Sequence, residues 1–316
     1  MKQMIFNNFL LYIILFSFLF TAEYSDFGLE IFSFSGDAQI HSLGGSPYNK
    51  SMSLNNIYSL NNFHQKGKLS FSYAQYYSGI LEYFQSSYII KNYKKSSLGI
   101  SFLHKKIENI PNTQNAWDDL GEIISQDQID YGEIDYYDDQ QISILLIYSF
   151  SSKIGDIGFK IKPVYTSILD YNALGVSFDI GINKKISNNY DMGILIKNLY
   201  SLNYWNTGSM SSLYPKVHIS NSFNYKKILL LNEISSSIYI KESNFDFNIK
   251  FGVEAPVSNK LKIRVGYSNE QSFSGGFGFD HNDISYSYSY SPNFHDIILG
   301  HNHQFSILLD LSKIKL

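Results

Sequence analysis

The stretch Ile284-Ser-Tyr-Ser-Tyr-Ser-Tyr-Ser291 has an apolar or aromatic side chain at every second position and a serine between each pair. Successive side chains of a β-strand point to opposite faces of the sheet, so this period of two predicts a strand with one apolar and one polar wall. The same alternation recurs in 176–182, 247–253, 261–267 and 305–311. It dominates the chain from about residue 67 onward.

Fourteen segments carry this pattern, and most exceed the ~5–6 residues typical of soluble strands. Their length suits the ~9–11 residues that a tilted strand needs to cross hydrocarbon, and their even number is that of single-chain bacterial barrels. We therefore predict an all-β fold, a transmembrane antiparallel β-barrel of about 14 strands with an N-terminal plug segment. The predicted strands are 67–77, 79–91, 94–106, 139–151, 155–168, 171–186, 188–201, 214–225, 228–242, 244–256, 258–270, 272–279, 281–291 and 299–311.

A soluble β-sandwich or β-propeller is the alternative fold. Such proteins bury the apolar face, and they have shorter strands with more glycine and proline in their connections. This chain has 26 Tyr, 24 Phe and only 6 Pro, and it has no cysteine. Abundant tyrosine is typical of the aromatic girdles of membrane barrels, which favours the barrel.

Residues 1–22 have the order of a secretory signal peptide: Lys2, an apolar run over 9–20, and the small pair Thr21-Ala22. An uncleaved inner-membrane anchor is the alternative. Removal of this segment takes away one basic residue and leaves 24 basic and 28 acidic ones. That balance argues against a nucleic-acid partner, which normally needs a basic stripe. We predict a mature protein in the outer membrane of a Gram-negative-type envelope, in contact with its lipid.

Residues 23–66 interrupt the strand pattern and form the predicted plug or hatch, ahead of a barrel over 67–316. Turn residues occur at Gly36-Asp37 and Gly44-Gly45, and 54–60 has helical spacing. Because the segment precedes the first strand, it lies either in the periplasm or inside the lumen. Paired glycines allow a tight turn close to the wall.

Residues 107–138 are the second exception and form a predicted long acidic extracellular loop, since barrels place long loops outside. Ten acidic side chains lie here, counting Asp139 at the next strand, and no basic one. Clustered carboxylates are the oxygen ligands that Ca²⁺ prefers, but the spacing is not that of an EF-hand. The other interpretation is a solvated surface loop. The calcium candidates are Asp118, Asp119, Asp127, Asp130 and Asp135.

The remaining polar residues do not form a catalytic constellation, so we predict that the chain is not an enzyme and needs no cofactor. His301 and His303 share one face of a strand, yet no third metal ligand can be assigned, which favours rim or lumen positions. Gly275–Gly278 lacks the helix and the Lys-Ser/Thr of a phosphate loop and is interpreted as a kinked strand. Charged residues on the polar side of their strands should face the lumen, where they can pair with Asp179 or with one another: Lys250, Lys262, Arg264 and Glu254.

Five strings resemble the PorV/PorQ-like outer-membrane proteins, which are relatives of the FadL-type barrels. They are LEIFSFSGDAQIHSLGGS (29–46), IENIPNTQNAW (107–117), FDIGINKKISNNYDMGILIKNLYS (178–201), FGVEAPVSNKLKIRVGYS (251–268) and LGHNHQFSILLDL (299–311). The chain departs from the family pattern at Gln39, where an arginine is usual. It also lacks the Asn-Pro-Ala-Gly stretch, having Ser53-Leu-Asn-Asn56 instead.

The resemblance implies a barrel of about fourteen strands with an N-terminal hatch, and one of two roles. PorV-like members serve type IX secretion, which predicts secreted cargo or secretion machinery as partners and a role in export or surface attachment. FadL-type members pass hydrophobic small molecules, and an apolar lumen patch such as Leu145 and Ile147 would favour that role. A structural barrel without any passage is a third interpretation, because fold does not fix function.

Overall fold

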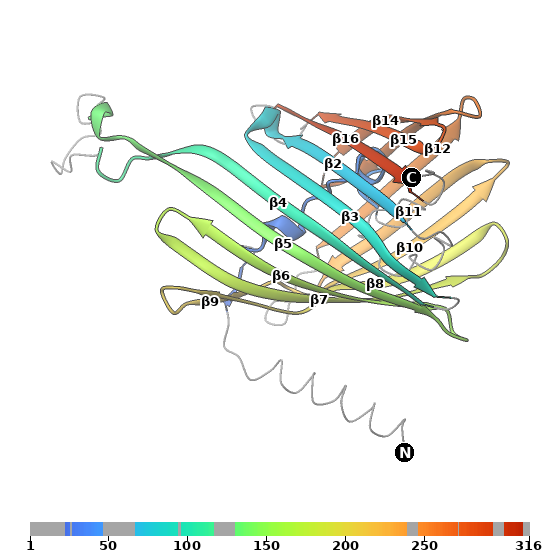
Figure 1. Ribbon diagram of the computed structural model, residues 1–316, viewed down its shortest axis with the longest axis horizontal. Helices are drawn as coiled ribbons and strands as arrows, with labels where there is room; N and C mark the ends of the chain where they lie inside the picture. The colour runs from blue at the N-terminus through green and yellow to red at the C-terminus, as the bar shows by residue number, and fades with distance from the viewer. Residues whose placement is uncertain are drawn as a thin grey trace, which may run out of the picture.

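The computed structural model describes residues 23–25, 27–46, 67–93, 96–116, 130–238, 246–270, 272–292 and 300–311. Fourteen long antiparallel strands pair in chain order, and the β16–β2 pairing closes them into a barrel (Figure 1). They are β2 (Lys68–Tyr76), β3 (Leu81–Tyr93), β4 (Ser96–Asn112), β5 (Asp135–Ser151), β6 (Asp156–Ile168), β7 (Tyr171–Lys185), β8 (Tyr190–Trp205), β10 (Lys216–Tyr225), β11 (Ile228–Ser237), β12 (Phe247–Pro256), β13 (Leu261–Ser268), β14 (Ser272–His281), β15 (Ile284–Pro292) and β16 (His301–Asp310). Each predicted segment corresponds to one of these strands, so the predicted fold class is confirmed.

The boundaries predicted for the acidic loop, 107–138, are wrong at both ends. β4 continues to Asn112 and β5 begins at Asp135, and these two residues pair directly. The register shifts between Ile107 and Ile110, where Asn109 has a φ of 56°. This bulge interrupts the alternation that marks a strand in the sequence, while the pairing itself resumes beyond it. The β4–β5 hairpin consequently projects beyond the other strands at the left of Figure 1.

The two ends of the barrel differ in their connections. At one end, which we call the turn end, consecutive strands are joined by two to four residues, as at 152–155, 186–189 and 226–227. The first barrel strand begins and the last one ends there. The opposite end, the loop end, carries the β4–β5 hairpin and the connection 206–215 with the short strand β9 (Met210–Ser212).

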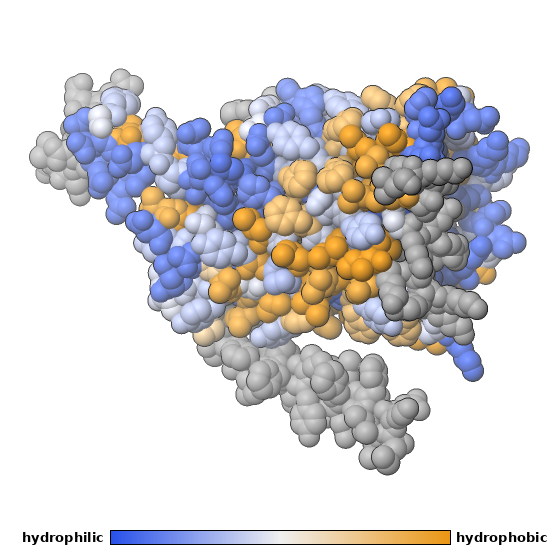
Figure 2. Space-filling model, viewed as in Figure 1, coloured by the Kyte–Doolittle hydropathy of each residue, from blue (hydrophilic) through white to orange (hydrophobic). Residues whose placement is uncertain are grey.

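Side chains alternate between an apolar outer wall and a polar inner wall. Tyr290 is 40% exposed on the outside, whereas the serines on either side of it, Ser289 and Ser291, are fully buried in the interior. Outward apolar residues such as Phe251 and Ile144 remain exposed rather than packing in a core between two sheets. On the face seen in Figure 2, apolar side chains gather in a band between more polar ends. This arrangement confirms that each strand has one apolar and one polar wall, and it excludes the sandwich.

Residues 27–46, which we call the inner segment, lie inside the barrel (Figure 1). Just before it, β1 (Glu23–Tyr24) pairs in parallel with β9. The inner segment contains the 3-10 turn η1 (Glu30–Phe32) and the short helix α2 (Ala38–Ser42). The predicted signal peptide and the helical spacing at 54–60 fall outside the described residues. In the described part of the chain, no helix has the length and apolarity needed to cross a membrane.

The inner segment touches the wall where the wall has glycine. Gly44 has a φ of +76°, a backbone conformation that other residues rarely adopt. A methyl group on Gly252 would meet Leu43, and one on Gly266 would overlap both Leu43 and Gly44. The Gly44-Gly45 turn can therefore lie flat against β12 and β13 only because both sides lack side chains.

Gly266→Val should dislodge the inner segment without preventing barrel closure, since the atoms nearest to the added Cβ all belong to the segment. The natural chain has no cysteine, so Ser42→Cys supplies a single, buried thiol as the reporter. We expect a hydrophilic maleimide to label it roughly tenfold faster in the Gly266→Val background.

Gly275→Val is the matched control, because the nearest atom to its added methyl group is 3.8 Å away. Heat-modifiable migration on gels reports that each barrel is folded. Equal protection of the thiol in both glycine variants would mean that the wall does not need these glycines to seat the segment.

Candidate functional site inside the barrel

The inner segment is hydrogen-bonded to inward side chains from strands on all sides of the barrel. The backbone N–H of Ile31 donates to Gln141 of β5 at 2.8 Å, and that of Ala38 donates to Ser306 of β16 at 2.8 Å. Between them, the Tyr76 hydroxyl of β2 donates to the Ser35 carbonyl at 2.7 Å. The segment is thus bound to the wall along its whole length.

Apolar side chains of the inner segment fill the space between these polar contacts. Leu29, Ile31 and Leu43 are fully buried and belong to one cluster with inward residues of the strands, among them Leu145 and Ile147. Burying one such side chain stabilises a protein by about 1.5–3 kcal/mol. The apolar patch expected of a transporter therefore exists, but the inner segment covers it.

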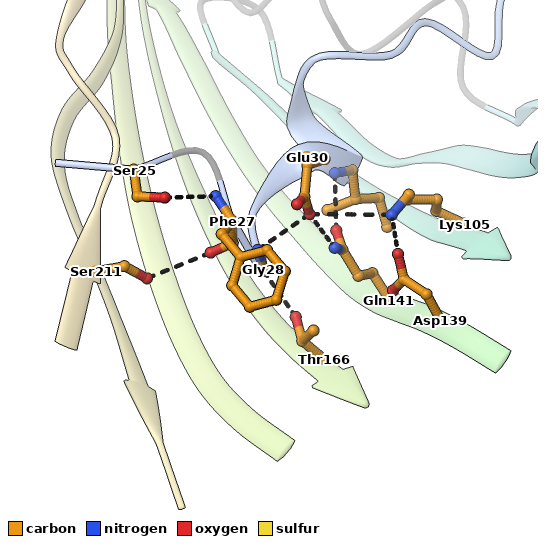
Figure 3. Close-up of polar contacts among 10 residues, drawn as sticks. Ser25, Phe27, Gly28, Glu30, Lys105, Asp139, Gln141, Thr166 and Ser211 are labelled. Carbon is orange, nitrogen blue, oxygen red and sulfur yellow. Dashed lines mark hydrogen bonds and ion pairs between the residues drawn. The ribbon is translucent and has the colours of Figure 1, made fainter. Parts of the chain in front are cut away.

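The first polar anchor joins η1 to β4, β5 and β6, as Figure 3 shows. The Lys105 ammonium group pairs with Asp139 at 2.6 Å and lies 3.9 Å from Glu30, which also accepts a hydrogen bond from Gln141. Thr166 donates to the Gly28 carbonyl at 2.7 Å. Lys105 is only 2% exposed, and these two carboxylates are its partners in the interior.

The second anchor is α2, whose first turn is capped by Asp37 through the N–H groups of Gln39 and Ile40. His41 lies fully buried on this helix, with Nδ1 3.1 Å from the Ser289 hydroxyl and Nε2 3.3 Å from that of Ser291. Burial lowers the pKa of His41 to about 4, so the imidazole is neutral near pH 7.

The third anchor surrounds Glu233, a fully buried carboxylate of β11. It pairs with Lys250 at 3.2 Å and with His218 at 2.9 Å, and it accepts a hydrogen bond from Ser46 at 3.2 Å. Lys250 in turn donates to the Gly45 carbonyl at 3.3 Å. The end of the inner segment is therefore tied to a charged pair of the wall.

Two further clusters complete the inner wall. Arg264 donates to Glu254 at 2.7 Å, and the same carboxylate oxygen accepts from Gln39 at 3.2 Å. Asp179 of β7 pairs with Lys162 at 2.7 Å, and the Lys160 ammonium group lies 3.8 Å away.

Of the charged residues predicted to face the lumen, some lie in the interior and one lies at the turn end. Lys250 and Arg264 are buried in the interior, and Arg264 has the predicted partner Glu254. Lys262 lies at the turn end, half-exposed, and pairs with Asp280 at 3.2 Å. The partner of Lys250 is Glu233, and those of Asp179 are Lys160 and Lys162, none of which the sequence had indicated. The sequence feature that could have indicated these partners is a charged residue at a polar position of an alternating strand, as at Lys160 and Lys162.

The calcium candidates remain a prediction. Asp118, Asp119 and Asp127 lie outside the described residues, and the described part of the chain has no cluster of metal-binding side chains. Asp130 caps the turn η5 (Tyr131–Glu133) through the N–H of Gly132 at 2.9 Å, and Asp135 is exposed.

His301 and His303 share one face, and that face is the outer wall. They lie beside Tyr290, and the Tyr288 hydroxyl is 2.7 Å from His303 Nδ1. These histidines therefore belong to an aromatic group outside the barrel, near the loop end, and not to the lumen. Gly275–Gly278 lies within strand β14, as expected.

The barrel is similar in fold to solved outer-membrane channels. The Pseudomonas putida toluene transporter TodX has a TM-score of 0.58 and 11% identity, over 87% of this chain and 96% of that one. A Pseudomonas aeruginosa FadL homologue has a TM-score of 0.52 and 11% identity, over 92% of this chain and 99% of that one. Comparison with curated protein sequences finds no match.

The closed antiparallel sheet and these likenesses define a β-barrel membrane protein with FadL-like architecture. Residues 133–309, more than half of the chain, match the family described as "Type IX secretion system membrane protein PorP/SprF". The chain belongs to this family of secretion-system membrane proteins. Neither the family nor the FadL-like barrels are enzymes, in agreement with the prediction.

Lys105→Met should strongly destabilise the barrel, because it leaves Asp139 and Glu30 without their shared cation in a buried site. We expect a loss of about 3–5 kcal/mol in the free energy of unfolding. Urea unfolding of the refolded protein in lipid vesicles, followed by tryptophan fluorescence, measures it.

Lys106→Met is the matched control, since the neighbouring lysine pairs with Glu108 and Asp138 on the more exposed outer side. Its effect should be much smaller. Similar losses in the free energy of unfolding of both variants would show that the inner ion pair stabilises the barrel no more than the outer one.

Proposed function

We propose that the protein is an outer-membrane component of a type IX secretion system that assists the export or surface attachment of secreted proteins. The observation that carries this proposal is the anchoring of the inner segment to strands all round the interior, together with the family match. An interior filled in this way supports an interaction role over free passage of solutes. Its partners would be secreted cargo proteins and the secretion machinery.

The same proposal fixes an orientation. Barrels have short turns in the periplasm and long loops outside, which would place the turn end in the periplasm and the β4–β5 hairpin outside. Cleavage of residues 1–22 would leave the mature chain in the outer membrane, surrounded by its lipid. The exposed acids of the hairpin, such as Glu133 and Asp135, would then attract basic segments of exported proteins.

The finer resemblance to PorV/PorQ-like proteins leads to the same role and remains a prediction. The second candidate function is a FadL-like channel for hydrophobic small molecules. The apolar wall residues around Leu145 favour it, as does the fold shared with a toluene transporter. In such a channel the inner segment would have to move, breaking its contacts with Gln141 and Glu233.

Glu133→Gln combined with Asp135→Asn should weaken cargo docking, because both changes remove charge from the exposed hairpin without disturbing the Asp130 cap. We expect a roughly threefold fall in secreted protein recovered at the cell surface at unchanged barrel abundance. The association of the purified barrel with a basic cargo should also weaken with salt.

Asp170→Asn with Asp246→Asn removes the same charge from other connections at the same end and should leave surface recovery unchanged. Unaltered recovery in the hairpin variant, combined with lost uptake of a hydrophobic solute in Leu145→Gln, would instead support the channel.

A further inference from the structure

The cluster around Asp179 has more cations than anions. Two other cations of the inner wall each have a carboxylate partner: Arg264 pairs with Glu254, and Lys250 pairs with Glu233. Around Asp179, by contrast, three lysines line one small cavity with a single carboxylate: Lys160, Lys162 and Lys197.

Lys162 and Asp179 satisfy each other. Asp179 Oδ1 lies 2.7 Å from the Lys162 ammonium group and accepts the backbone N–H of Asn198 at 2.9 Å. Lys162 also donates to Asn198 Oδ1 at 2.7 Å and lies 4.5 Å above the Phe32 ring. These contacts occupy Asp179 Oδ1, and Oδ2 lies 3.8 Å from the Lys160 ammonium group, so one carboxylate faces three lysines.

Lys160 and Lys197 are the two lysines whose ammonium groups have few hydrogen-bond or ion-pair partners. Lys160 is 3% exposed, and among the described residues its one ion-pair contact is to Asp179 at 3.8 Å. Within the described part of the chain, the Lys197 ammonium group has no hydrogen bond and no ion pair shorter than 4 Å. The nearby carboxylates, Asp179 and Glu233, are each engaged by another lysine. Lys160 and Lys197 are close enough to repel each other.

The cavity that these lysines line is small and closed over by the inner segment. Its volume is about 20 Å³, and Ile31, Phe32 and Phe34 contribute to its lining together with apolar residues of the wall. A site of that size holds one particle as large as a water molecule. Chloride is closer to this size than a larger oxyanion such as phosphate is.

Two under-coordinated ammonium groups beside an apolar lining are costly unless their charge is balanced. We propose that this cavity is a binding site for one small monovalent anion of the chloride class, held between Lys160 of β6 and Lys197 of β8. The ion bridges two strands on either side of β7 and lies beneath Phe32, so it also fixes the inner segment. This site is independent of the role in secretion.

Bromide is the probe, because it replaces chloride and can be located by anomalous diffraction. Crystals of the full chain grown in bromide should show a peak in this cavity. Purified wild-type protein should melt roughly 5 °C higher in chloride than in gluconate, which is too large for the site. Lys197→Met should lose this difference, and Lys262→Met, which alters a paired lysine at the turn end, should keep it.

Absence of a bromide peak in the cavity, with equal melting temperatures in the two salts, would overturn the proposal in favour of neutral or water-bound lysines. Peaks confined to the protein surface, an adventitious ion only, would overturn it as well. If Lys197→Met does not fold, the wild-type bromide map and the wild-type melting comparison decide the question alone.

Discussion

Hydrocarbon offers no hydrogen-bonding partner, and this constraint acts on every residue of the barrel wall. The backbone satisfies it by pairing each strand with its neighbours until β16 meets β2. The side chains satisfy it by alternation, which sends Ser289, Lys250 and their equivalents inward. The interior of the barrel thereby receives the serines, amides and charges that the outer wall excludes.

Those inward groups then need partners of their own. Some find them in the wall, where Glu233 lies directly opposite Lys250 and Glu254 directly opposite Arg264 in the strand register. Others find them in the inner segment, which supplies the Glu30 carboxylate, the backbone N–H of Ile31 and the Ser46 hydroxyl. The segment also covers the apolar wall around Leu145. The same contacts therefore let the inner segment fill the interior and bind it to the wall. For this reason we favour an interaction role over an open pore.

The strands could be predicted from the sequence because alternation is a local signal. Fourteen segments were expected, and the described residues form fourteen barrel strands; several boundaries differ by a few residues, and the bulge near Asn109 hid the end of β4. The inner segment was expected in either the periplasm or the lumen. Its paired glycines indicated that it lies close to the barrel wall, but they did not indicate which strands it contacts. Apart from Arg264 and Glu254, the ion-pair partners were not predicted, because a pair such as Lys160 and Asp179 depends on the register between two strands. A shift of one residue would turn one of them to the other face.

Electrical conductance across planar lipid bilayers tests whether the inner segment closes the barrel. The full chain is compared with a variant that lacks residues 27–46, both shown to be folded by heat-modifiable migration. If the inner segment closes the barrel, the full chain gives no steady conductance and the deletion variant gives stable open channels. Equal, steady conductance from both proteins would contradict closure by the inner segment, because ions would then cross the full chain as freely as they cross the barrel without the segment.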